Sequence, residues 1–330
     1  MTAIDRVPAT PPEILPVPND VVRPLWSVMI PVYNCTEYIE AAINSVLQQY
    51  PGEDKMHIEV IDDCSTDADV GALVERVGKG KVQYFRKEKN MGSIRNFETC
   101  VSRSKGHYVH ILHGDDFVLD GFYAEIERLF ETDPTAGAAF TDFNFVNEEG
   151  EFLYSEVPLQ DNDGIVEDAL GKLAVKQLIQ PPAMVIKRSV YENIGSYYAV
   201  LNCEDWLMWA RVAAQYPILY SRKHLACYRK RTNNLTHDAL TNGRYVIDLR
   251  TVMNIIETLL PPERRKELIK KQHRHFSIYQ AWISHLIYHN YKNKQAALDM
   301  VKSALSLDVN FTTLKLASKL WFKALIGYKQ

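Results

Sequence analysis

The first part of this chain alternates short apolar segments with amphipathic ones, and this alternation constrains the fold more than any other feature. The apolar segments have strand length, and we expect strands at residues 26–34, where the apolar run stops at Pro31, and at 57–63, 81–87 and 107–113. Helical spacing predicts helices at 36–50, 67–77 and 93–104. In the first, Thr36 is the expected cap, and the apolar face carries Ile39, Ile43, Val46 and Leu47. Repeated strand–helix units predict an α/β fold with a mostly parallel sheet covered by helices.

Polar residues follow three of these strands at the point where each strand ends. Tyr33 and Asn34 follow the first, Asp62 and Asp63 end the second, and the run His113-Gly114-Asp115-Asp116 follows the fourth. Ligands of open α/β sheets bind at the carboxyl ends of the strands. The sequence therefore predicts a binding site at this edge of the sheet.

The remainder of the chain predicts a mixed region followed by helices. We expect a helix at 121–130, a hairpin at 136–156 turning at 147–150, a strand and short helix at 181–195, a helix at 203–216, the last sheet segment at 224–234, and helices from about Tyr245. Six prolines before residue 25 predict an extended, poorly ordered lead-in. The expected division is a lead-in at 1–25, a sheet-containing domain at 26–235 and a helical C-terminal extension at 236–330.

Composition excludes several function classes. The five cysteines form no CxxC pair, so neither a zinc site nor a disulfide framework is indicated. A formal net charge of -3 gives no reason to expect nucleic acid as a partner. No secretory signal pattern opens the chain and no run of 18 apolar residues occurs, so we expect a cytoplasmic protein without a membrane span.

Five motifs occur in order along the chain: PVYN at 31–34, VIDDCSTD at 60–67, KNMGSIRN at 89–96, LHGDDF at 112–117 and CEDWLMWARV at 203–212. Together they resemble family-2 glycosyltransferases of the GT-A fold, and the resemblance covers about residues 26–231. It implies a nucleotide-diphospho-sugar-binding α/β domain, a divalent metal and transfer of a sugar with inversion at the anomeric carbon.

The resemblance assigns the first three motifs to the nucleotide. Asp63 would accept the imino hydrogen of the base, a directional charge-assisted bond. The other expected donor-binding residues are Pro31, Tyr33, Asn34, Asn90, Gly92 and Arg95. The alternatives are structural: Asp62, Asp63 and Ser65 would form a turn that caps a helix, Tyr33 would pack at the rim, and Arg95 would lie on the surface.

The fourth motif resembles the family's metal site. Mg²⁺ and Mn²⁺ bind carboxylates together with phosphate oxygens, and the ion would offset charge on the departing diphosphate. Asp116 is the expected direct ligand, and Asp115 would contact the metal, the ribose or a water. His113 stands where relatives more often have an acid. The alternative is that both acids lie exposed in a loop.

The fifth motif supplies an acid pair at the start of a helix. By resemblance, Asp205 is the general base that accepts the acceptor hydroxyl's proton, and Glu204 is its neighbour or orienter. Ordinary helix capping is the alternative. Many relatives have a histidine after a Tyr-Arg pair that holds metal or diphosphate; here either Arg231 or His237 could take that place.

The C-terminal segment 311–326 predicts a basic amphipathic helix. Lys315, Lys319 and Lys323 lie four residues apart, and no acid follows Asp308. Leu314, Leu320, Trp321 and Leu325 supply apolar bulk. Such a helix suits peripheral contact with an anionic membrane at the inner face of the plasma membrane. The alternative is a terminal helix packed on the catalytic domain with solvated lysines.

These observations lead to one functional hypothesis. The chain transfers a sugar, in a hexosyltransferase-type reaction, from a nucleotide-sugar donor that we expect to be UDP-linked to a hydroxyl of a glycan or lipid-linked acceptor in cell-surface polysaccharide synthesis. Two alternatives are a nucleotidyltransferase, which would need a glycine-rich basic loop that the first strand lacks, and a non-catalytic nucleotide-sugar-binding scaffold.

Overall fold

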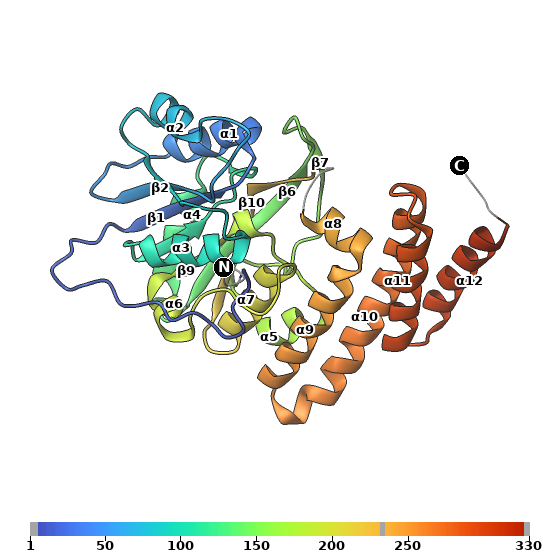
Figure 1. Cartoon of the computed structure of the whole chain (residues 1–330). Coiled ribbons are helices and arrows are strands. Elements are labelled where there is room, and N and C mark those ends of the chain that lie inside the picture. Colours follow the sequence, from blue (N-terminus) through green and yellow to red (C-terminus); the bar gives the residue numbers. More distant parts are fainter. Residues whose placement is uncertain (1–5, 232–234, 327–330) are drawn as a thin grey trace. The chain divides into compact units, whose positions relative to one another are not determined.

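The computed structural model describes the backbone of residues 6–231 and 235–326, and their side chains except those of 235–237 (Figure 1). The chain divides into two compact units. The first, which we call the sheet unit, comprises residues 1–169 and 179–231. The second, the helical unit, comprises residues 170–178 and 232–330.

The sheet unit is built on one mixed sheet in which the predicted strands are neighbours. In spatial order the strands are β3 (Gln83–Arg86), β2 (Met56–Asp62), β1 (Trp26–Val32), β4 (Tyr108–Ile111), β9 (Met184–Lys187), β6 (Ala138–Val146), β10 (Ile218–Arg229) and β5 (Phe117–Val118). Two short strands extend it: β7 (Phe152–Ser155) beside β6 and β8 (Gly164–Ile165) beside β10. The first four are parallel, as predicted, while β9 runs antiparallel to both of its neighbours.

Strand β1 ends two residues short of the predicted range 26–34, but it includes Pro31, where the apolar run of the sequence stops. It passes through Pro31 and ends at Val32. Pairing with β4 ends at Met29, and the Pro31 carbonyl instead accepts a hydrogen bond from the Gly114 backbone N–H at 3.2 Å. Because no ladder bond is required of the proline nitrogen there, proline is tolerated in this central strand.

Helices cover the sheet as the apolar spacing predicts. They are α1 (Thr36–Leu47), α2 (Val70–Gly78), α3 (Ser93–Arg103), α4 (Phe122–Thr132), α6 (Arg188–Ile194) and α7 (Glu204–Ala213), with a 3₁₀ turn η1 (Pro181–Ala183). Helix α1 buries Ile39, Ile43 and Val46, but its cap differs from the expectation. Cys35 holds the cap position, and the Thr36 N–H and hydroxyl donate to Asp67 Oδ2 at 3.0 and 2.7 Å. The nearby acid draws Thr36 into the first turn and ties α1 to the loop after β2.

Two of the buried polar groups in the sheet unit, His110 and Glu125, show how partners hold such groups in the core. His110 of β4 is fully buried and contacts the Tyr123 hydroxyl at 3.2 Å and the Pro182 carbonyl at 3.0 Å. Burial lowers the pKa of His110 to about 3. Glu125 of α4 is also buried, and its bonds to Arg128, Lys223 and Ser221 lower its pKa to about 2.

The proline-rich lead-in is extended, as predicted, but residues 6–25 are anchored instead of poorly ordered. The carbonyls of Pro8, Pro12 and Leu15 accept hydrogen bonds from Ala199, Ser196 and the Arg188 guanidinium. Ile14 is buried. Proline lacks a backbone N–H but keeps its carbonyl, so a proline-rich segment can still be fixed by donors from a folded surface.

The helical unit consists of helices from consecutive parts of the chain. They are α8 (Leu235–Asn242), α9 (Arg244–Leu259), α10 (Pro262–His289), α11 (Lys294–Leu307) and α12 (Phe311–Leu325), joined by most of α5 (Ala169–Val175). Helices α11 and α12 both pack against the long α10 (Figure 1). Among the described residues, no helix combines the length and the apolar character needed to cross a membrane.

Candidate active site

The carboxyl ends of β1, β2 and β4 meet at one edge of the sheet, where the sequence places the polar motifs. The loop after β4 is fixed to β1 through the Gly114 N–H, as described above. A side chain at Gly114 would lie 2.7 Å from Val32 Cγ1 and 2.9 Å from Cys35 Sγ. Only glycine permits this approach, and it holds the acids that follow it against the end of β1.

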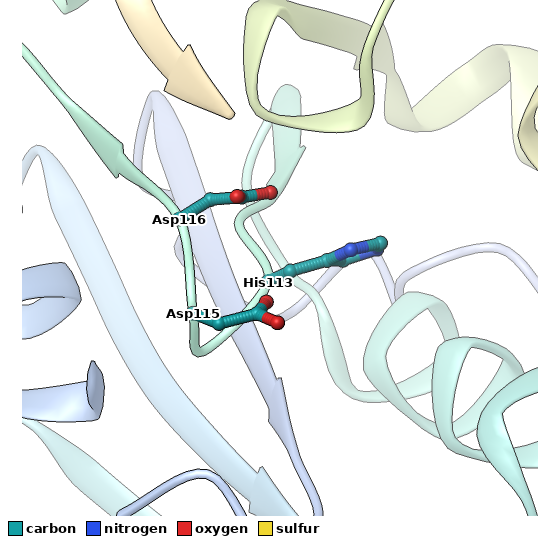
Figure 2. A group of neighbouring side chains, drawn as sticks. All are labelled: His113, Asp115 and Asp116. Atoms are coloured by element: carbon teal, nitrogen blue, oxygen red, sulfur yellow. The ribbon is translucent and has the colours of Figure 1, made fainter. Parts of the chain in front are cut away.

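His113, Asp115 and Asp116 form a compact group of metal-ligating side chains. Each offers one ligand atom, and these atoms lie within 4.8 Å of one another. Figure 2 shows the three side chains projecting to the same side of the loop. The structure thus brings two of the expected ligands, Asp115 and Asp116, together and adds His113 to them.

The environment of Asp116 leaves one of its carboxylate oxygens available to a cation. Its Oδ1 accepts the Arg229 backbone N–H at 2.8 Å, whereas its Oδ2 is buried and has no hydrogen-bond partner among the described residues. Burial, followed by the charge of Asp115, raises the pKa of Asp116 well above its usual value. An unpartnered buried carboxylate oxygen is costly, and a bound cation would remove that cost. The residues present therefore fit a divalent ion.

His113 is oriented by an aromatic neighbour. Its ring stacks on Phe97 of α3, with centroids 5.1 Å apart and planes inclined by 5°. Burial lowers the pKa of His113, against a smaller opposing effect of Asp115. A neutral imidazole has a nitrogen lone pair that can bind a metal.

Strand β10 and the segment directly after it supply two arginines to this group, Arg229 and Arg231. It pairs with β5, which begins directly after Asp116. Arg229 Nε donates to the Asp115 carbonyl at 2.7 Å, and Arg231 Nη1 to Asp115 Oδ2 at 2.8 Å. The Arg231 guanidinium also lies 4.8 Å from the Tyr38 ring centroid. Of the two candidates near this position, Arg231 is brought to the acids, while the His237 side chain lies outside the described residues.

The second acid pair opens onto the same region. Glu204 and Asp205 form the first turn of α7, and Asp205 Oδ1 accepts the Trp206 N–H at 2.7 Å. Both acids line a cleft that His113 also lines; its other walls are Phe97, Ile111, Pro181, Met184, Tyr191, Tyr197 and Trp209. Burial and the charges of both acid pairs raise the pKa of Tyr228. Both acid pairs therefore lie within electrostatic range of Tyr228, and His113 of the metal-ligating group lines the cleft beside Glu204 and Asp205.

The expected base-recognition residue Asp63 is engaged within the protein. Its buried carboxylate accepts the Gly92 N–H at 2.7 Å and the Met91 N–H at 2.9 and 3.1 Å, and it forms an ion pair with Lys87 at 3.3 Å. Gly92 has a φ of +91°, which glycine adopts without strain. In this state Asp63 holds the loop before α3 in place.

The other expected donor-binding residues differ in how far their side chains are exposed and in whether they bond within the protein. Tyr33 is exposed and Asn90 is half-buried at this edge. Pro31 is buried in β1, and Asn34 joins two loops by accepting the Thr66 N–H at 2.8 Å. Arg95 pairs with Glu98 of its own helix at 2.7 Å. Pro31 and Asn34 are thus held within the protein, whereas the Tyr33 side chain is exposed.

Residues 27–195, just over half of the chain, match the model of glycosyl transferase family 2. The chain belongs to this family. The putative teichuronic acid biosynthesis glycosyltransferase TuaG of Bacillus subtilis is 28% identical over 160 residues, which cover 46% of this family-2 chain and 62% of TuaG. The match thus spans less than two thirds of TuaG.

Two solved structures resemble this family-2 chain in fold. TarS of S. aureus, crystallised with UDP-GlcNAc, has a TM-score of 0.62 at 15% identity over 92% of each chain. PcManGT, a mannosyltransferase from Pyrobaculum calidifontis in complex with GDP-Man and Mn²⁺, has a TM-score of 0.58 at 18% identity over 97% of this chain and 85% of its own. The predicted GT-A fold with a helical C-terminal region is confirmed.

Several residues of this family-2 site were not identified from the sequence. Arg229 contacts both acids, Phe97 orients His113, and Lys87 pairs with Asp63. The position of Lys87 in the sequence could have indicated this contact, because Lys87 directly follows β3, the strand that pairs with β2. Arg229 belongs to the Tyr-Arg pair noted in the sequence, but nothing local shows its partner, because Asp116 lies 113 residues away and the two meet only through strand pairing.

Proposed function

We propose that this chain transfers a sugar from a nucleotide-diphosphate donor to an acceptor hydroxyl, with inversion and with the help of a divalent cation. The observation that carries the proposal is the unpartnered Oδ2 of Asp116. It belongs to a ligand group with His113 and Asp115, and His113 lines the same cleft as Glu204 and Asp205. A cation site and a carboxylate pair on one cleft provide for leaving-group stabilisation and proton removal together.

The cation would be held by Asp116 and His113, with Asp115 beside them. Mn²⁺ and Mg²⁺ both accept carboxylate oxygens, and the imidazole favours Mn²⁺ because Mg²⁺ strongly prefers oxygen ligands. When bound, the ion offsets the negative charge that develops on the departing diphosphate. Arg231, already beside Asp115, adds a second positive group whose planar fork suits phosphate oxygens.

Asp205 would act as the general base and Glu204 would orient it. The position of Asp205 in the first turn of α7 favours its ionised form, since the helix N-terminus carries partial positive charge. One base and one displacement imply inversion at the anomeric carbon.

The donor's base would lie against Tyr33 and the loop at residues 90–92. Asp63 fixes this loop through the Met91 and Gly92 N–H groups, so we assign it a positioning role alongside any direct contact with the base. A UDP-linked donor is the first choice, supported by the UDP-GlcNAc bound to TarS in a similar fold. A GDP-linked donor is the second, from PcManGT. For the acceptor, TuaG's name supports a glycan or lipid-linked intermediate of cell-wall polysaccharide synthesis.

The test is a turnover assay of the full chain with UDP-, GDP- and dTDP-sugars and Mn²⁺ or Mg²⁺, with nucleoside diphosphate release as the readout. We expect release with one donor class, lost on chelation and in Asp205→Asn. Asp120→Asn, an exposed acid nearby, is the matched control. Formation of a nucleoside triphosphate and a sugar 1-phosphate when pyrophosphate is added would indicate a nucleotidyltransferase, and donor binding without turnover would indicate a scaffold; either result overturns the proposal.

A second measurement separates direct base recognition by Asp63 from loop positioning. If Asp63 only positions the loop, Asp63→Asn weakens binding of UDP, GDP and dTDP by similar factors. If it also reads the base, the loss is larger for the nucleotide of the true donor. Equal affinity of the variant and the wild type for all three would contradict both roles.

A further inference from the structure

Helix α12 presents two different faces, and only one of them contacts the helical unit. Thr313, Ala317, Leu320 and Ala324, spaced by three and four residues, are buried. The Thr313 hydroxyl lies 3.0 Å from that of Ser277, and the Leu316 carbonyl accepts from His285 at 3.0 Å. Leu320 therefore packs inward within the helical unit, and α12 is a fixed part of that unit.

The opposite face of α12 is apolar and exposed. Phe311, Phe322 and Leu325 are 82%, 64% and 86% exposed, and Leu314 and Trp321 are 45% exposed each. At about 100° per residue, these five side chains occupy about 100° of arc. Large exposed side chains gathered on one face mark an interaction surface.

A row of lysines borders this apolar face. Lys315, Lys319 and Lys323 fall within the adjoining arc of about 80°, and residues 309–326 contain no acid. Lys315 and Lys319 are exposed, whereas Lys323 contacts His289 Nε2 at 2.7 Å. Lysines beside an apolar strip can extend their ammonium groups to lipid headgroups while their stems lie along acyl chains.

The charge of the whole helical unit supports an anionic partner. This unit carries 17 Lys and Arg against 7 Asp and Glu, a formal charge of +10, whereas the sheet unit carries 21 against 34. The net charge of -3 for the chain conceals this separation. A second copy of the chain fits the face poorly, because two lysine rows would meet without acids.

We propose that α12 binds the surface of an anionic lipid bilayer, lying in the interface plane with Trp321, Phe322 and Leu325 among the acyl chains. The lysine row faces the headgroups. The opposite face keeps its contacts with α10, so binding requires no unfolding of the helical unit. The proposal is independent of the sugar donor and of the reaction.

The first experiment measures sedimentation of the full chain with vesicles of phosphatidylcholine, with or without about 30% phosphatidylglycerol. We expect binding that depends on phosphatidylglycerol and weakens with salt. Lys315→Gln/Lys319→Gln should lower the partition coefficient about tenfold or more, and Trp321→Ser/Leu325→Ser should lower it at least as much. Lys302→Gln and Ile247→Ser, at exposed positions elsewhere in the helical unit, are the matched controls and should bind as wild type.

The second experiment locates the inserted residue. Acyl chains labelled with bromine should quench tryptophan fluorescence in wild type and in Trp282→Phe, but much less in Trp321→Phe; both tryptophans are about half exposed. Equal binding of all variants overturns the proposal, as does quenching that persists without Trp321. Release by a soluble polyanion with no quenching would assign the surface to a polyanion, and loss of a dimer in Trp321→Ser/Leu325→Ser would assign it to a second copy.

Discussion

The two units of this chain use charge in opposite ways. In the sheet unit the decisive charges are few, buried and close together: Asp116 has an oxygen without a partner, and Arg229 and Arg231 bond to the acids around it. In the helical unit the decisive charges are exposed lysines in excess over acids. A buried charge depends on one specific partner, whereas exposed charges act additively and are screened by salt. A single substitution of a buried charge in the sheet unit should therefore abolish its function. Each substitution of an exposed lysine on α12 should weaken membrane binding by a smaller, additive step.

The largest effect is expected at Asp116. Asp116→Asn should reduce sugar transfer by about 10³-fold or more, because it removes the carboxylate that the cation needs. In the absence of any cation the same variant should unfold at the same or a higher temperature than wild type, since a buried unpartnered charge is lost. Activity and thermal unfolding, with and without Mn²⁺, check both parts. A wild-type Mn²⁺-induced rise in Tm that survives in the variant would place the cation elsewhere.

His110 provides the next effect, a pH dependence of stability confined to the sheet unit. The pKa of His110 is about 3 in the folded state, compared with 6.5 for an unperturbed histidine. Between these two values the unfolded chain therefore binds a proton at His110 and the folded chain does not. Stability from this group is complete above pH 6.5 and falls toward pH 3, by about 3–5 kcal/mol in total at 1.36 kcal/mol per pKa unit. His110→Gln should flatten the slope of unfolding free energy between pH 6.5 and about 5.

The choice of this window isolates His110 from Glu125. The pKa of Glu125 is lowered from 4.5 to about 2, so its contribution to stability is lost only as the pH falls below 4.5 toward 2. His107→Gln is the comparison: burial and Arg23 lower the pKa of this exposed histidine as well, so its removal should flatten the slope, but less than removal of the buried His110. Urea unfolding at each pH measures the slope, and an unchanged slope in His110→Gln would show that the pKa of His110 is the same in the folded and unfolded states.

The same contrast explains what could be predicted from the sequence. The strand–helix units and the hairpin are local patterns, so their positions were predictable, as was the gathering of Asp63 and Asp116 at one edge. Contacts made by distant strands were not: Arg229 reaches Asp116 because β10 pairs with β5, and β9 enters the sheet in the opposite direction. Periodicity shows which face of a segment is apolar but not what covers it. For that reason it could not show that Leu320 packs inward while Trp321 stays exposed.

The smallest effect on stability is expected from substitutions on α12. They test whether the exposed lysines of the helical unit contribute to membrane binding without contributing to folding. Lys315→Gln and Lys319→Gln should each change the free energy of unfolding by less than about 0.5 kcal/mol, because both lysines are exposed. Turnover with a soluble donor should also stay at the wild-type level. Binding to phosphatidylglycerol vesicles, by contrast, should fall by about fivefold for each lysine and by the product for both. If the double variant instead lost stability or turnover, the lysines would belong to a structural network, and the contrast between the two units would fail.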